Sequence, residues 1–200
     1  MFALVESGKI TKYLKGNKGI TIGDNKYPQA IFTLWSKDER EAIGIYDIET
    51  DSTNYKDKKW YINTNESYTF ANNKVTRSWG TATAKAHEDT LWTEEDKTDG
   101  NIPEGKDVGD VKVEGLKTIL IKTLKSQAAG ELQNTDWYII RKADAGTAVP
   151  SAITTHRAAV RTKAAEMETA ITNASDTPAL ETLYTYTTND AGIKSRPLGE

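Results

Sequence analysis

The sequence contains no cysteine. This absence excludes disulfide bonds, thiolate metal sites and cysteine nucleophiles. Long apolar runs are missing too, since none approaches the roughly 20 residues that a transmembrane helix requires. The opening residues lack the basic region and the apolar stretch of a secretory signal peptide. We therefore expect a protein that is made in a cytosol, stays soluble and has no membrane partner.

Neither sign of charge dominates the chain. It has 26 Lys and Arg residues against 29 Asp and Glu residues, which gives a formal net charge of −3. A dedicated nucleic-acid-binding protein usually carries a strongly basic face, so this balance argues against nucleic acid as a partner. Apolar residues make up only 37% of the chain. Because a small core buries a small share of the surface, we expect partner surfaces to contribute to stability.

The first 93 residues are expected to form a β-rich docking module. Short apolar stretches at 2–5 and 10–14 are typical of strands joined by a turn. The clearest hairpin is predicted at 67–79, where Asn72 and Asn73 separate two alternating stretches. Asn tolerates the left-handed backbone that a tight hairpin turn requires.

One short helix is predicted between these strands. Ser36 and Glu39 have the spacing of a capping box, in which each side chain satisfies a free backbone amide of the other residue. Gly44 is expected to end this helix, because the alternating residues 45–48 indicate another strand.

The second half of the chain shows a helical period. Residues 94–110 are polar, aperiodic and rich in turn residues, which predicts a linker. The residues Leu116, Ile119, Leu120 and Leu124 then form one apolar stripe of a helix.

A second long helix is predicted after Pro150, with Ser151 as its cap. Its apolar stripe has nearly heptad spacing and includes either His156 or Arg157, together with Ile153, Val160, Ala164, Met167 and Ile171. This helix should pack antiparallel to the helix centred on Leu120. Thr177 followed by Pro178 has the order of a cap and then a proline, which predicts the start of a last short helix with Thr177 as its cap.

The predicted fold class is therefore α+β. A β-rich N-terminal module with a short helix (1–93) is followed by a linker (94–110). A helical module (111–200) contains the antiparallel helix pair and ends in an extended tail from Asp190.

Catalytic, metal and cofactor sites are not indicated. His87 lies beside two acidic residues, but neighbours on a helix point about 100° apart and seldom share one ion, so a solvated helix face is expected. His156 has no nucleophile at a recognisable spacing. The Gly16–Gly19 segment lacks the Gly-Lys-Ser/Thr ending of a phosphate loop and precedes a strand, which favours a simple turn. We expect no enzyme activity and no cofactor.

The segment 135–142 is the strongest candidate for partner binding. Asp136 is expected to begin a short helix that places Trp137 over the groove between the two long helices. Trp137 is then expected in the core, with partner binding as the alternative reading, whereas Tyr138 and Arg141 remain open between a core and an interface role. Trp, Tyr and Arg are the residues that dominate binding hot spots.

The same region carries a family resemblance. Thr135-Asp136-Trp137-Tyr138 is followed about twenty residues later by a helix with paired arginines, Arg157 and Arg161. This pattern resembles the tail assembly chaperone domains of tailed bacteriophages, although His156 stands where that family usually has Tyr. Residues 31–46 resemble the opening module of phage tail proteins. The resemblance implies a tail-associated role and adds His156, Arg157 and Arg161 to the candidate partner-binding residues.

Three functions follow from these observations. The first is a structural component of the virion tail (baseplate, fibre attachment or decoration), made in the host cytoplasm and bound to other phage tail proteins or to itself as a homo-oligomer. The second is an assembly chaperone for the tail or tail fibre that leaves the mature virion. The third is a carbohydrate-binding tail domain whose exposed rings stack on sugars, although no carboxylate pair for glycoside cleavage is evident. The rings expected for that role are Trp60, Tyr61, Tyr68 and Trp79.

Overall fold

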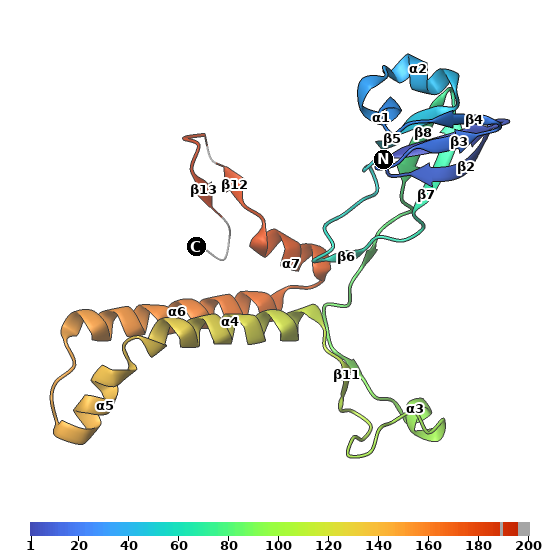
Figure 1. Ribbon diagram of the computed structural model, residues 1–200. Helices are drawn as coiled ribbons and strands as arrows, with labels where there is room; N and C mark the ends of the chain where they lie inside the picture. The colour runs from blue at the N-terminus through green and yellow to red at the C-terminus, as the bar shows by residue number, and fades with distance from the viewer. Residues whose placement is uncertain (189, 196–200) are drawn as a thin grey trace. The chain divides into compact units, whose positions relative to one another are not determined.

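The computed structural model describes residues 1–188 and 190–195. It confirms the α+β class: strands dominate the N-terminal half, and long helices dominate the C-terminal half (Figure 1). The chain divides into two compact units, residues 1–83 and residues 84–200. The boundary therefore comes before the segment 94–110, which the sequence predicts as a linker. None of the described helices is both long enough and apolar enough to cross a bilayer.

A curled five-stranded sheet forms the N-terminal unit. In spatial order its strands are β2 (Lys9–Leu14), β1 (Phe2–Glu6), β5 (Ile45–Thr50), β8 (Lys74–Ser78) and β7 (Ser67–Ala71). All neighbours are antiparallel except β5 and β8, which are parallel. Short strands β6 (Tyr61–Ile62) and β9 (Thr83–Ala84) lie outside this sheet.

The predicted hairpin around Asn72 and Asn73 is confirmed. Strands β7 and β8 pair from Ser67 with Ser78 to Ala71 with Lys74. The two asparagines have φ values of 51° and 57°, which is the left-handed conformation that the turn requires. The sequence therefore determines this turn locally.

A small core lies on one side of the sheet. The hairpin of β3 (Ile20–Ile22) and β4 (Asn25–Tyr27), together with helix α1 (Ile31–Leu34), contributes to it. Its buried side chains are Leu4, Ile20, Ile31, Phe32 and Ile45.

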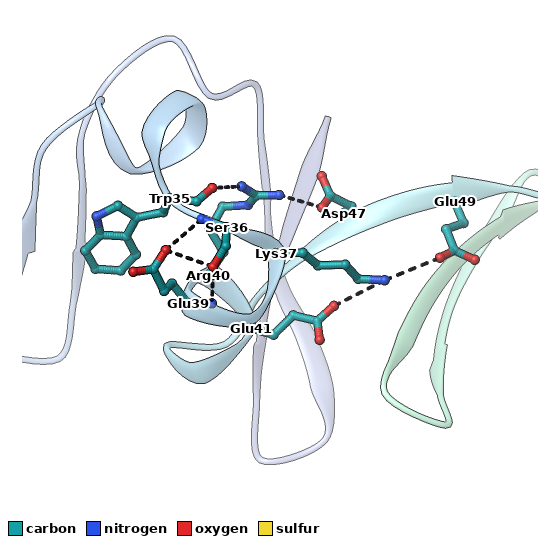
Figure 2. Close-up of polar contacts among 8 residues, drawn as sticks. All are labelled: Trp35, Ser36, Lys37, Glu39, Arg40, Glu41, Asp47 and Glu49. Atoms are coloured by element: carbon teal, nitrogen blue, oxygen red, sulfur yellow. Dashed lines mark hydrogen bonds and ion pairs between the residues drawn. The ribbon is translucent and has the colours of Figure 1, made fainter.

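Helix α2 (Lys37–Ala42) confirms the predicted capping box, which Figure 2 shows. The Ser36 backbone N–H donates to Glu39 Oε2 at 2.7 Å, and the Glu39 N–H donates to Ser36 Oγ at 3.3 Å. The Ser36 N–H is the main cause of the lowered pKa of the Glu39 carboxyl, and the Ser36 hydroxyl, which donates to the same oxygen at 2.8 Å, adds to it. Gly44 has φ of 81°, and a Cβ there would lie 2.6 Å from the Val5 carbonyl oxygen, so only glycine fits where α2 turns into β5.

Two long antiparallel helices form the main part of the C-terminal unit. Helix α4 (Leu116–Gln133) packs along α6 (Ser151–Asn173), as predicted. The Lys125 ammonium lies 2.8 Å from the Glu168 carboxylate across this pair. The apolar stripe of α4 buries Leu116, Leu120 and Leu124, whereas Ile119 is exposed.

The residues that precede α6 and α7 differ from the two predicted caps, Ser151 and Thr177. The residue before α6 is Pro150, and Ser151 is already the first helical residue, without a side-chain cap. Helix α7 (Thr177–Tyr184) is capped by Asp176, whose side chain accepts from the Ala179 N–H. Thr177 is instead buried, and its hydroxyl donates to the Lys85 carbonyl at 2.6 Å. Both residues stand one position inside the helix, where a hydroxyl cannot cap the free amides.

The N-terminus of α4 is capped by a distant residue. Gly115 at the N-cap has no side chain, and its N–H donates to Asp89 Oδ1 at 2.6 Å. The Thr118 hydroxyl donates to the other carboxylate oxygen at 2.9 Å. The Gly115 N–H is the main cause of the lowered pKa of Asp89, and the Thr118 hydroxyl adds to it. His87 lies in a bend just before Asp89 and not on the expected helix. Its backbone carbonyl accepts from the Lys117 N–H.

The segment 94–110 is not a bare linker. It contains helix α3 (Glu94–Thr98), which a capping box between Thr93 and Asp96 stabilises. It lies between strands β10 (Thr90–Leu91) and β11 (Val111–Val113), which pair with each other. The Lys112 ammonium bonds Asp96 at 2.6 Å, so polar contacts order a segment without apolar periodicity.

The predicted extended tail from Asp190 lies partly outside the described residues, since 196–200 are not described. Within the described part, β12 (Thr187–Thr188) pairs antiparallel with β13 (Lys194–Ser195). The backbone there is extended, but it forms a hairpin.

Candidate partner-binding site

Helix α5 (Asp136–Ala145) lies at the end of the α4–α6 pair and connects the two helices (Figure 1). None of its residues is buried. The exposed fractions are 49% for Trp137, 42% for Ile139 and 67% for Ile140. Large apolar side chains that cluster on an exposed surface mark an interaction site more often than scattered ones do.

The predicted core position of Trp137 is wrong. Helices α4 and α6 pack directly on each other. Trp137 lies on α5 at the end of this pair and is half exposed. Trp137 instead stacks on its own helix, with its ring centroid 4.0 Å from that of Tyr138.

Arg141 completes this aromatic cluster. Its guanidinium carbon lies 4.6 Å from the Trp137 ring centroid and 5.5 Å from that of Tyr138. Arg141 stands four positions after Trp137 and three after Tyr138, and both spacings bring side chains together on one side of a helix. A cation held over two rings fixes their orientation, so the cluster is a preorganised surface.

Arg157 holds α5 in place and is itself buried, with 6% of its surface exposed. Its Nη1 donates to the Leu132 carbonyl at 2.8 Å and to the Thr135 hydroxyl at 2.6 Å. Its Nη2 lies 2.8 Å from a carboxylate oxygen of Asp136. The guanidinium thus bonds the end of α4, the turn and the start of α5 from one position on α6.

The remaining two candidates are also on α6. His156 and Arg161 are both exposed. Arg157, and not His156, therefore occupies the open position in the stripe between Ile153 and Val160.

A hollow of about 340 Å³ is lined by residues of α5, the following loop and α6. Its wall has apolar groups from Ile139 and Val149 and cationic groups from Lys142 and Arg161. The lining residues are Ile139, Lys142, Ala148, Val149, Thr154, Arg157 and Arg161. This combination suits an apolar side chain flanked by acidic ones.

The sequence interpretation missed Ile139, Ile140 and Lys142. The spacing of Trp137 and Arg141, four residues apart on a helix, is the local signal that indicates the stack. No local signal indicates that Ile139 is exposed, because that depends on how α5 packs on the end of the α4–α6 pair.

The four rings expected to bind sugars do not form an exposed platform. Trp60 and Tyr61 are only 3% and 5% exposed. The Arg77 guanidinium lies over the rings of Tyr68 and Trp79, at 6.0 Å and 4.5 Å from their centroids. Across residues 1–188 and 190–195, no group of three or more His, Asp or Glu side chains is placed to hold a metal ion.

No family model matches the chain, and no curated protein or solved structure is similar to it.

Proposed function

We propose that this chain is a structural component of a bacteriophage tail, in the baseplate, at the fibre attachment or as a decoration protein, and that α5 docks it on another tail protein. The observation that carries the proposal is the exposure of α5, a ten-residue helix with no buried side chain and with Trp137, Ile139 and Ile140 on its surface. The assignment to a phage tail rests on the sequence resemblance alone.

The composition of this surface favours protein as the partner. Trp, Tyr and Arg are the residues most often found at binding hot spots, and Trp137, Tyr138 and Arg141 contact one another here. The Arg157 contacts hold α5 in one orientation, so docking orders few additional groups. A specific interface would bury at least roughly 1,000 Å² in total.

Peptide mapping of purified virions of the encoding phage tests the proposal. A structural protein is expected in the particles at a fixed ratio to the major tail protein. An assembly chaperone uses the same docking surface but occurs only in the infected-cell lysate. Detection in the lysate and not in the virions would therefore assign the second function in place of the first. Absence from both fractions contradicts both functions.

Affinity capture of tail proteins tests the surface. The variant Ile140→Asp places a charge on the exposed face of α5 and should reduce capture at least about tenfold, because it desolvates a carboxylate at the interface. Leu34→Asp is the matched control, since Leu34 is 80% exposed in the N-terminal unit. Equal capture by both variants excludes α5 as the docking surface, and light scattering of the free protein shows whether a second copy occupies it.

A further inference from the structure

The loop that follows β2 surrounds a second hollow, in the N-terminal unit. Residues 12–21 and Phe32 line a volume of about 720 Å³. Small-molecule sites in proteins usually measure roughly 300–1,000 Å³. The loop includes Gly16 to Gly19, which the sequence interpretation assigns to a simple turn, and it does form bends between β2 and β3.

Two glycines fix the shape of this loop. Gly16 has φ of 73°, and a Cβ there would lie 2.9 Å from Phe2 Cε2. A Cβ on Gly19 would lie 2.6 Å from the Tyr27 carbonyl oxygen. The loop therefore packs closely on β1 at Gly16 and on β4 at Gly19, and the hollow is formed before any ligand arrives.

Three lysines line the hollow without a counter-charge. Within the described residues, the ammonium groups of Lys12, Lys15 and Lys18 form no ion pair. Other cations of the same unit are paired, including Arg40 with Asp47 and Arg77 with Glu66.

The charge of this region is opposite to that of the whole chain. The first 30 residues contain five lysines and only two carboxylate residues, while the complete chain has a net charge of −3. The region thus concentrates positive potential in one hollow, and potentials confined to a concave surface attract oppositely charged ligands.

The walls indicate that the ligand has a ring as well as charges. Tyr13 lines the hollow and is 53% exposed, and its ring lies 4.8 Å from that of Tyr68. Asn17 and Thr21 add an amide and a hydroxyl group that hydrogen-bond hydroxyl groups. Leu14 and Phe32 give the hollow an apolar wall.

We propose that this hollow binds an acidic oligosaccharide, with its carboxylate or sulfate groups on Lys12, Lys15 and Lys18 and a sugar ring against Tyr13. A lone phosphate or sulfate would leave most of the volume and the apolar wall unused. A nucleic acid needs a longer basic surface, whereas beyond residue 30 the chain has more acidic than basic residues. This site is independent of α5 and of the proposed docking function.

Calorimetric titration of the intact chain with defined oligosaccharides tests this inference. The probes are a sulfated heparin tetrasaccharide, trigalacturonic acid and neutral maltotriose. We expect one or both acidic probes to bind, and their affinity to fall as salt is raised, because salt screens the lysine charges. Maltotriose should not bind.

The triple variant Lys12→Gln, Lys15→Gln, Lys18→Gln should weaken binding at least about tenfold. The triple variant Lys106→Gln, Lys163→Gln, Lys194→Gln changes the net charge equally in the other unit and should bind normally. The single variant Lys15→Gln, with a loss of about twofold to threefold, covers the case in which the first triple variant does not fold.

Several results would overturn the inference. These are no binding of either acidic probe at millimolar concentration, equal binding of maltotriose, equal losses in the two triple variants, or tighter binding of a single-stranded oligonucleotide than of both acidic sugars. The last result would make the hollow a nucleic-acid site.

Discussion

Each unit of this protein contains one arginine that joins secondary-structure elements in the same way. In the N-terminal unit, Arg40 donates from Nη1 to the Trp35 carbonyl at 2.5 Å and from Nη2 to Asp47 at 2.7 Å (Figure 2). In the C-terminal unit, Arg157 bonds the Leu132 carbonyl and Asp136 at 2.8 Å each. In both, the Nε atom is buried and has no hydrogen-bond partner among the described residues.

The two arginines differ in what surrounds them. Arg40 lies beside an apolar core, with its guanidinium carbon 5.2 Å from the centroid of the Phe2 ring. Arg157 occupies an apolar-stripe position of α6, and the helix that it holds buries no side chain. We infer that a polar contact only supplements apolar packing in the first unit but replaces it at α5. The predictions below test this difference.

The largest effect is expected for Arg157→Ala. The substitution removes three polar contacts from a side chain that is 7% exposed, and it leaves the Leu132 carbonyl without this partner. A loss of about 3 kcal/mol in the free energy of unfolding of the helical unit should result. Chemical denaturation followed by circular dichroism at 222 nm measures it. Arg161→Ala, which removes an exposed side chain one turn further along the same helix, should change the stability by less than about 0.5 kcal/mol.

Arg40→Ala should have a smaller effect, about 2 kcal/mol on the N-terminal unit, because the adjacent apolar core remains intact. Near-ultraviolet circular dichroism of the Tyr27 and Trp35 environment, whose rings lie 5.9 Å apart, follows this unit. A loss equal to or larger than that of Arg157→Ala would contradict the proposed difference between the units.

Asn73→Val should destabilise the N-terminal unit by about 1–2 kcal/mol. A β-branched residue resists the φ of 57° at this position. Asn73→Gly is the matched control and should leave the thermal midpoint nearly unchanged, since glycine adopts this conformation without strain. Equal midpoints for the Val and Gly variants would mean that the turn does not require a left-handed residue.

The two units should also respond to acid through different carboxylates. Hydrogen bonds in the folded state lower the pKa of Asp89, so its contribution to stability is complete above the ordinary Asp pKa of about 4. That contribution is lost as the pH falls from there through the lowered pKa. Asp89→Asn should therefore weaken the pH dependence of the thermal midpoint of the helical unit in this range. Glu39→Gln should do so only for the N-terminal unit, because its carboxylate caps α2.

Apart from the control variants, the smallest effect on stability is expected for Trp137→Ala. An indole that is 49% exposed contributes little to the core, and the loss should stay below about 1 kcal/mol. Its partner binding should nevertheless fall, because a hot-spot side chain is removed. A loss near 3 kcal/mol with unchanged binding would assign Trp137 to the core instead.

Much of the N-terminal unit could be predicted from the sequence. The Ser36–Glu39 capping box, the Asn72-Asn73 turn and the end of α2 at Gly44 all depend on residues a few positions apart. The hydrogen bonds and φ angles that define them are set within that short distance. The apolar period likewise predicts α4, α6 and their antiparallel packing.

The candidate site could be predicted only in part. The segment 135–142 was recognisable by its composition, but the environment of Trp137 was not. Whether its indole is buried depends on how α5 packs on the end of the α4–α6 pair, and the contacts that Arg157 makes from α6 fix this packing.

The sequence by itself determined the helix and strand periods, the local caps and the turns, because those energies act between neighbours in the chain. Only the tertiary structure decided which charged residues became buried and paired. Arg157 bonds Leu132 and Thr135, more than 20 positions away, and Asp89 caps a helix that begins 27 residues later. Such contacts produce no periodic pattern in the sequence. They stabilise the protein only when the folded chain brings the partners together and removes them from water.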